Sequence, residues 1–135
     1  MGKSLVTAIV AVCLLLGCSD ATSSTAAAVS GSWMLQERIV GSSFLMTLVA
    51  DGSAISGTGA FQGEVGLGGS SIVTGSVTGS EVNLDFTLTT VLADTTITGT
   101  AHFTGRPRLG VLSGTMQSGV ESPSNPPVPA VFVRY

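Results

Sequence analysis

Apolar and polar residues alternate one by one along most of the chain after residue 30, and this pattern predicts β-strands. The clearest run is 81–88, where every second residue is apolar: Val82, Leu84, Phe86 and Leu88. Residues 96–103 repeat the arrangement, with one face formed by Ile97, Gly99, Ala101 and Phe103. A period of two is typical of a strand that buries one face and exposes the other. Because no segment keeps a helical period of apolar residues for long, we expect an all-β protein.

Turn residues divide this pattern into about eight strands. Typical turn sequences fall between the apolar runs, among them Asp51-Gly52, Thr78-Gly79-Ser80 and Gly105-Arg106-Pro107. The strands are expected at residues 32–38, 43–50, 54–62, 70–78, 81–90, 95–104, 108–117 and 130–135. The connections are short except for 118–129, which carries four prolines. This connection either covers a barrel mouth or meets a partner, or it simply returns the chain to the first strand.

Short links between successive strands predict an antiparallel meander. An open sheet of this size would expose two edge strands, whereas closure removes both edges. We therefore expect a closed up-and-down barrel, with a β-sandwich as the alternative. A recurring apolar–Ser/Thr–Gly–Ser/Thr motif places glycine on the apolar face at Gly57, Gly75, Gly99 and Gly114. In a narrow barrel, such glycines are expected to let the sheet coil and to make room for large side chains opposite.

The first residues of the chain have the parts of a signal peptide. Lys3 is followed by the uncharged apolar run 5–16, which is shorter than the roughly 20 residues needed to cross a bilayer. The run ends in Leu15-Leu16-Gly17-Cys18, which resembles the lipobox of bacterial lipoproteins. This resemblance implies cleavage between Gly17 and Cys18 and attachment of fatty acyl chains such as palmitate to Cys18. Two or three such chains, at about 0.8 kcal/mol per buried methylene, hold a protein stably on a membrane.

The same resemblance implies a location and a division of the chain. Ser19, next to the lipidated cysteine, favours the outer membrane of a bacterial cell envelope, facing the periplasm or the cell surface. The chain then divides into a signal peptide, 1–17, a lipidated flexible tether, 18–30, and a barrel domain, 31–135. A tether is expected because 19–30 is small and polar without periodicity. An ordinary secretory signal that ends in a chance cysteine is the alternative.

Cysteine usage and charge exclude several functions. Cys13 leaves with the signal peptide and Cys18 carries lipid, so the mature domain is expected to have no cysteine for a disulfide, a metal or catalysis. The net charge is −3, and the only lysine, Lys3, belongs to the signal peptide. Nucleic-acid binding needs a basic surface that neutralises phosphates, so no nucleic-acid partner is expected.

Two short motifs resemble those of the calycins, which include lipocalins and avidins. They are Gly31-Ser32-Trp33 at the first strand and residues 131–135 at the last one. The resemblance implies that Trp33 closes one end of the barrel, with Arg134 lying over its indole in a cation–π contact. Biotin binding is not implied, because Gly59 stands near the position where avidins carry a tyrosine and Trp33 is the only tryptophan.

The chain offers little catalytic or metal-binding chemistry. His102 is the only histidine and lies on the polar face of its predicted strand, so no catalytic triad or zinc site is expected. Glu81 and Asp85 share one polar face about 13 Å apart, which is too far for a glycosidase pair. Arg106-Pro107-Arg108 is expected at an exposed hairpin tip. We therefore expect no enzyme activity, no metal and no cofactor.

Two functions remain. The residues expected to face the barrel interior form an apolar set: Phe44, Met46, Leu48, Ile55, Phe61, Val82, Leu84 and Phe86. They suit a binding module for a small apolar ligand, held on the membrane by its lipid anchor. Equally, they fill a small barrel completely, since about eight strands leave an interior that side chains can just fill. A solid barrel would instead belong to a structural lipoprotein or to one that binds another envelope protein.

Overall fold

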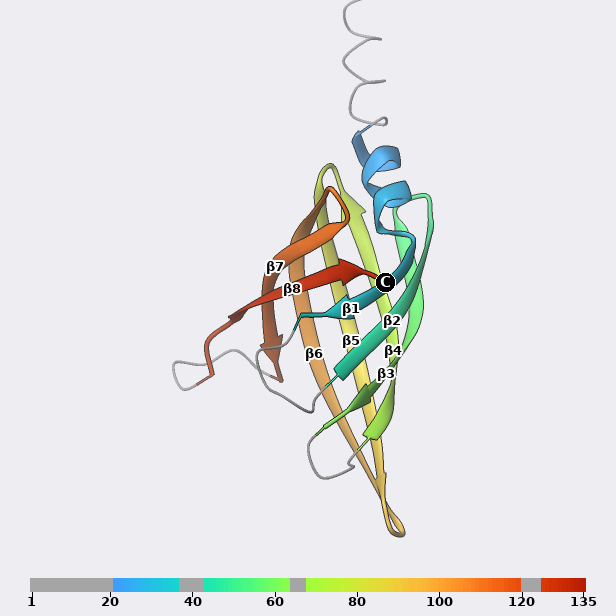
Figure 1. Ribbon diagram of the computed structural model, residues 1–135, viewed down its shortest axis with the longest axis vertical. Coiled ribbons are helices and arrows are strands. Elements are labelled where there is room, and N and C mark those ends of the chain that lie inside the picture. The colour runs from blue at the N-terminus through green and yellow to red at the C-terminus, as the bar shows by residue number, and fades with distance from the viewer. Residues whose placement is uncertain (1–20, 37–42, 64–67, 120–124) are drawn as a thin grey trace, which may run out of the picture.

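The computed structural model describes residues 21–36, 43–63, 68–119 and 125–135, and most of these residues lie in β-strands. The strands are β1 (Gly31–Leu35), β2 (Ser43–Asp51), β3 (Ala54–Gln62), β4 (Gly68–Thr78), β5 (Glu81–Leu92), β6 (Thr95–Arg108), β7 (Val111–Ser118) and β8 (Val128–Arg134). A helix over residues 21–29 precedes β1. Figure 1 shows the helix at one end of the strands and the β5–β6 hairpin projecting at the other.

Every strand pairs antiparallel with its neighbours in sequence, and β1 pairs with β8 to close the sheet. The closing pairs include Trp33↔Arg134, which brings the first and last strands of the domain together. The closed, eight-stranded up-and-down barrel confirms the predicted fold and excludes the sandwich. Closure matters physically because it gives every strand of the barrel a partner on both sides.

Apolar side chains fill the barrel interior over much of its length. The residues predicted to face inward are all buried except Phe61, which is half-buried. Phe132 on β8 packs edge-on against Phe44 and Phe103, with ring centroids 6.2 and 5.3 Å apart. Such aromatic pairs contribute about 0.5–1.5 kcal/mol each beyond the burial of their area. The core therefore joins β2, β6 and β8 across the interior.

Three glycines of the recurring motif lie where the sheet leaves no room for a side chain. A Cβ at Gly57, Gly75 or Gly114 would overlap a carbonyl oxygen of the neighbouring strand. This close approach agrees with the role expected of them in a narrow barrel. Gly99 differs, because a Cβ there would meet nothing within 4 Å.

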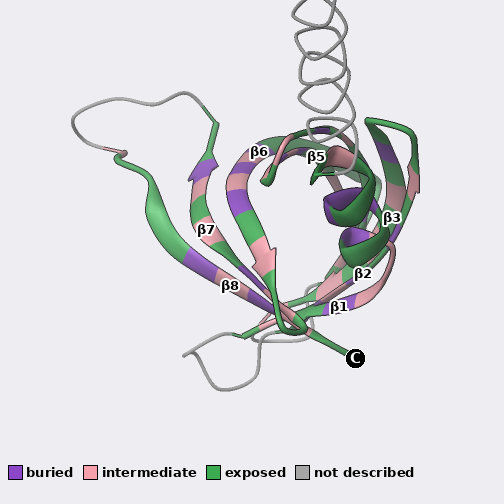
Figure 2. Ribbon diagram, turned by 90° about the horizontal axis from the view of Figure 1, so that it is seen from above, coloured by how far each residue is buried: buried purple, intermediate pink, exposed green. Residues whose placement is uncertain are grey.

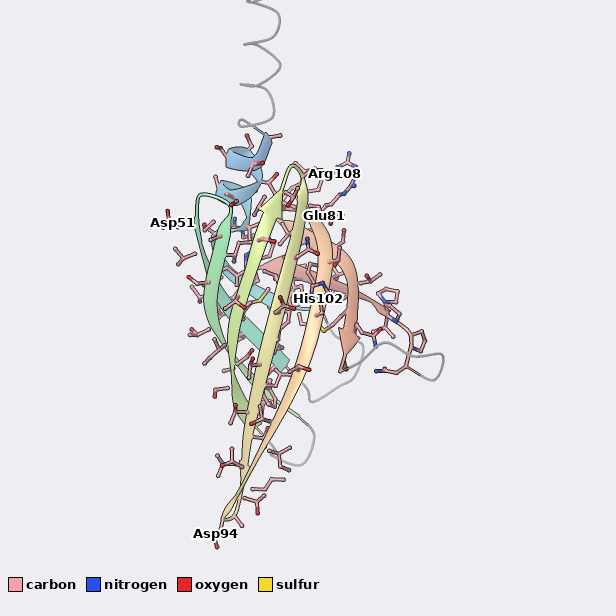
Figure 3. All side chains as sticks on the ribbon, turned by 180° about the vertical axis from the view of Figure 1, so that it is seen from behind. Asp51, Glu81, Asp94, His102 and Arg108 are labelled. Carbon is pink, nitrogen blue, oxygen red and sulfur yellow. The ribbon has the colours of Figure 1, made fainter. Side chains whose placement is uncertain are left out.

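Gly99 is open because β5 and β6 continue beyond the rim of the barrel. Among the described residues, β4 pairs with β5 as far as Gly69↔Thr90, and β7 pairs with β6 as far as Ala101↔Ser118. Residues 91–100 therefore form a two-stranded ribbon, in which every residue is exposed. We call residues 91–100 the arm. Figure 3 shows its tip, at Asp94, far from the barrel end that carries Asp51 and Glu81.

The turn between β6 and β7 is not where the sequence predicted it, because Arg106-Pro107-Arg108 belongs to β6. Pro107 lies opposite Leu112 in the β6–β7 register. The turn itself consists of Leu109 and Gly110, whose φ angles are 52° and 77°. Glycine adopts this left-handed conformation without steric cost, so Gly110 sets the turn and the two arginines remain exposed just before it.

Residues 21–29 are helical, which differs from the flexible tether expected over 18–30. Thr25, Ala26 and Val29 are buried on one face of this helix, spaced as one helical face requires. Figure 2 shows the helix over one end of the barrel. The hydroxyl of Thr22 accepts a hydrogen bond of 3.2 Å from the backbone N–H of Gly79 in the β4–β5 turn. A helix this short depends on such packing rather than on its own propensity.

The connection from β7 to β8 lies outside the described residues at 120–124, but its described part folds back toward β7. Nε2 of Gln117 donates a hydrogen bond of 2.6 Å to the carbonyl of Asn125. The side-chain amide of Asn125 donates to the carbonyl of Ser118. Pro129, expected in the loop, lies in β8. These contacts fix where the last strand begins.

Candidate functional site

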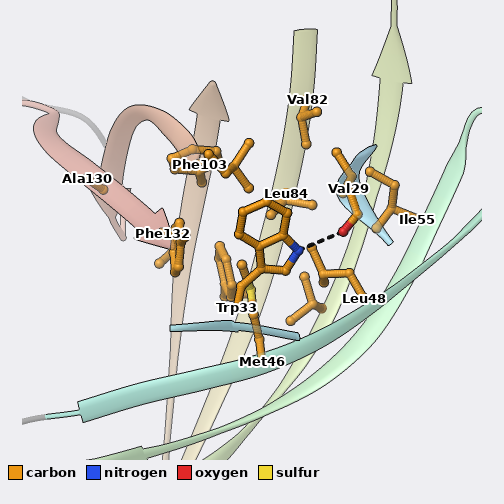
Figure 4. Close-up of a cluster of buried hydrophobic side chains, with 14 of the residues drawn as sticks. Val29, Trp33, Met46, Leu48, Ile55, Val82, Leu84, Phe103, Ala130 and Phe132 are labelled. Atoms are coloured by element: carbon orange, nitrogen blue, oxygen red, sulfur yellow. Dashed lines mark hydrogen bonds between the residues drawn. The ribbon is translucent and has the colours of Figure 1, made fainter. Parts of the chain in front are cut away.

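Trp33 and Arg134 hold the helix against one end of the barrel. Nε1 of Trp33 donates a hydrogen bond of 2.7 Å to the carbonyl of Val29, as Figure 4 shows. Cζ of Arg134 lies 4.5 Å from the centroid of the Trp33 ring, so the expected cation–π contact is present. The Arg134 guanidinium also donates to the carbonyls of Ala28 and Ser30, at 2.5 and 2.6 Å. A cation is favourable there, because the last carbonyls of a helix lack partners and carry partial negative charge.

The opposite end of the barrel holds an apolar pocket of about 240 Å³. Its lining includes three aromatic rings and three other large apolar side chains: Phe44, Phe61, Phe86, Leu35, Leu88 and Met116. The pocket lies where β1 and β7 end while β5 and β6 continue. Large side chains, Trp33 and Phe103 among them, are fully buried deeper in the barrel. The barrel thus has a filled core toward the helix and a cavity toward the opposite end.

The chemistry of the pocket suits an apolar group. None of its described lining residues is ionisable, and its polar side chains are Ser43 and Gln62, which pair across β2 and β3 at the rim. Each methylene that leaves water for such a lining contributes about 0.8 kcal/mol. The described lining offers no acid or base to a bound molecule. The pocket can therefore bind an apolar group by excluding water from it.

A second cluster of polar residues lies on the outer face of β5 and β6, and the sequence did not predict its contacts. Nδ1 of His102 lies 2.7 Å from Oδ1 of Asp85, its cross-strand neighbour. Nε2 of His102 lies 3.1 Å from the hydroxyl of Thr104. That hydroxyl donates to Oδ1 of Asn83 at 2.9 Å, and Nδ2 of Asn83 donates to Glu81 at 3.4 Å. Glu81 and Asp85 are therefore joined through one chain of hydrogen bonds.

This chain places a carboxylate, an imidazole and a hydroxyl in sequence, as a catalytic triad does. The hydroxyl, however, has one hydrogen, and Thr104 donates it to Asn83. That hydrogen is therefore directed to Asn83 and not to Nε2 of His102, so the imidazole is not placed to accept it. The side chains of His102 and Asp85 are 45% and 68% exposed, as the polar face of the strand predicted. We interpret the cluster as a surface network that links two strands.

Replacing Asp85 with asparagine is therefore expected to change the free energy of unfolding by less than about 1 kcal/mol. The reason is that solvent screens an ion pair between side chains this exposed, and that holding both side chains still costs entropy. Urea denaturation followed by circular dichroism measures the change. Asp51→Asn, at the exposed last position of β2, serves as the matched control. A loss of several kcal/mol for Asp85→Asn alone would show that the network is a structural element of the barrel.

The remaining predicted sites are separate from the pocket or lie outside the described residues. Gly17 and Cys18 belong to the latter group, so the lipid-attachment prediction is not tested by the fold. No three His, Cys, Asp or Glu side chains gather closely enough to bind a metal ion among the residues that the structure describes. Within the same residues, no helix has the length and hydropathy needed to span a bilayer.

The fold defines the chain as a closed, eight-stranded antiparallel β-barrel, an architecture compatible with that of the calycins. Comparison with known proteins adds no closer assignment, since no family model, no curated protein and no solved structure matches the chain.

Proposed function

We propose that this chain is a lipid-anchored protein of the bacterial cell envelope, and that its barrel binds a small apolar ligand at the open end. The lipobox resemblance at Leu15-Leu16-Gly17-Cys18 supports the anchor. The observation that carries the binding function is the pocket of about 240 Å³, with its three phenyl rings and no ionisable side chain in its described lining. Ligand pockets for drug-sized molecules occupy about 300–1,000 Å³, so this one suits a short apolar group.

The anchor and the pocket belong to opposite ends of the barrel. Cys18 precedes residue 21 by three positions, so an acylated cysteine starts within about 11 Å of the helix. The helix contacts the β4–β5 turn, whereas the pocket lies at the far end of β3, near Phe61 and Gln62. The proposed pocket therefore opens away from the anchoring membrane and takes its ligand from the aqueous side.

Octanol is expected to bind this pocket with a dissociation constant on the order of 1 mM. Burial of about eight carbon groups favours binding, and the translational and rotational freedom that the ligand loses offsets part of this free energy. Octanol is titrated into a protein of residues 19–135 that carries isotope-labelled methionine methyl groups, and NMR measures the chemical shifts of these methyl groups. This segment contains every described core residue and the pairing that closes the barrel, so it is expected to fold without the leader. Met116 in the pocket should shift and saturate, while Met34, 37% exposed on β1, should not.

Two alanine-to-leucine substitutions separate pocket binding from nonspecific contact. Ala101 lines the pocket and is 7% exposed, so Ala101→Leu fills part of the cavity and is expected to weaken octanol binding at least tenfold. Ala60→Leu, at an exposed position of β3, is the matched control and should leave binding unchanged. No saturable shift of Met116 would refute ligand binding. The filled core would then favour the second function, a structural or protein-binding lipoprotein.

A further inference from the structure

The inner face of the arm continues the wall of the pocket. Leu88 and Ala101 line the pocket, and Leu88 lies opposite Gly99 in the β5–β6 register. The next pair with the same orientation is Thr90↔Ile97, and the one after it is Leu92↔Thr95. Two strands thus carry one surface, without interruption, from the pocket toward the tip of the arm.

This inner face is exposed, and it carries two large aliphatic residues beside Thr90 and Thr95. Ile97 and Leu92 are 51% and 36% exposed although both are large aliphatic residues. Gly99 lies between Ala101 and Ile97 on this face. A Cβ there would meet nothing within 4 Å, so the missing side chain leaves a shallow depression in the surface directly beyond the pocket. The outer face carries threonines opposite each other at Thr87↔Thr100 and Thr89↔Thr98, with Val91 as its aliphatic residue. The two faces of the arm therefore differ, and the side that continues the pocket carries the larger aliphatic residues.

We propose that the ligand is a single straight-chain amphiphile whose head group is not anionic, and that its chain leaves the pocket along the inner face of the arm. This inference rests on the proposed binding function. The pocket, at about 240 Å³, holds about eight groups of roughly 30 Å³, the volume of a water molecule. From Leu88 to Leu92 the arm adds about 13 Å, at about 3.3 Å per residue. The two large aliphatic residues of this face, Leu92 and Ile97, lie on neighbouring strands about 4.8 Å apart, a spacing that one extended chain can cover.

The charge of the arm argues against an anionic head group. Among the residues of β5, the turn and β6 between Phe86 and Ala101, Asp94 at the tip is the only ionisable one. The whole chain carries a net charge of −3. An anionic head group emerging near the tip would meet repulsion from Asp94, whereas an alcohol, an amide or a sugar would not.

The test compares hexanol, octanol, decanol and dodecanol, with the Met116 methyl resonance as the readout on residues 19–135. Binding should tighten about fourfold per added methylene, and this gain should continue beyond octanol. Ile97→Thr should leave hexanol and octanol binding unchanged and weaken dodecanol binding about tenfold. Val91→Thr makes the corresponding change on the outer face and should alter none of the four.

The outcomes distinguish the two proposals. If hexanol and octanol do not bind, the proposed function itself fails. If they bind but the affinity stops rising at octanol, or if Ile97→Thr and Val91→Thr behave alike, the pocket stands and the inference about the arm is refuted. Sedimentation velocity adds one further outcome. A dimer that Ile97→Thr dissociates would show that a second copy of the chain, rather than an amphiphile, covers the arm.

Discussion

Replacing Trp33 with alanine is expected to lower the free energy of unfolding by about 3–5 kcal/mol. The indole is 1% exposed, so its removal leaves a cavity at the end of the core. The substitution also removes the hydrogen bond to Val29 and the ring beneath Arg134. A domain of this size is stabilised by only about 5–15 kcal/mol, so the loss is a large fraction of its stability. Urea denaturation followed by far-ultraviolet circular dichroism measures it.

Two substitutions show which property of Trp33 matters. Trp33→Phe keeps most of the buried ring but loses the Nε1 donor, so it is expected to destabilise by a smaller amount, near 1–3 kcal/mol for an unpaired buried carbonyl. Met34→Ala removes the adjacent, outward-facing side chain and should change stability by less than about 1 kcal/mol. Equal effects of Trp33→Ala and Met34→Ala would contradict the closing role of the indole.

Cys18→Ala in the full chain is expected to abolish acylation and to release the protein from membranes of a bacterial host. The proposed thioether link to diacylglycerol requires the sulfur of this cysteine, and a chain without the acyl chains would have no stable hydrophobic anchor. Metabolic labelling with an alkyne analogue of palmitate and fractionation of the cells measure the two effects. Cys13→Ala is the matched control, because Cys13 lies in the segment that the proposed cleavage removes, so the label should persist. A wild-type chain that takes up no label would refute the anchor.

The register of the barrel could be predicted in outline from the alternation of residues. β3 begins and ends where turn and strand patterns predicted, at Ala54 and Gln62. The inward face of β5 was equally clear, because Val82, Leu84 and Phe86 recur with a period of two. These features are local, since each strand shows in its own residues which face meets the core.

The candidate site could be predicted only in part. Apolar residues such as Phe44 and Phe86 were assigned to the interior, but filling and lining a cavity need the same residue types. Whether a space remains depends on where neighbouring strands stop, as β1 does at Leu35. The pairing of Asp85 with His102 was missed for a related reason, because it joins residues of two strands through their register.

The arm and the helix illustrate the same limit. Residues 81–88 and 96–103 alternate like any strands, and nothing in them shows that β4 and β7 end before the β5–β6 hairpin does. Residues 21–29 are small, mostly alanine, serine and threonine, and Val29 is their one large apolar residue. The helical spacing of the buried Thr25, Ala26 and Val29 is therefore not visible as a hydrophobic pattern. The barrel end buries these three residues and so stabilises the helix.

The sequence by itself therefore determined the strands, the face that each one buries and the antiparallel order of successive strands, because alternation and short turns are local properties. Closure pairs β1 with β8, the two ends of the domain, so the structure decided it against the sandwich. Only the tertiary structure decided the helix over one end, the pocket at the other and the exposed inner face of the arm. The helix needs the barrel end to pack against, and the pocket and the arm exist because neighbouring strands end before β5 and β6 do. These neighbours are distant in sequence, so a local pattern of residues cannot show them.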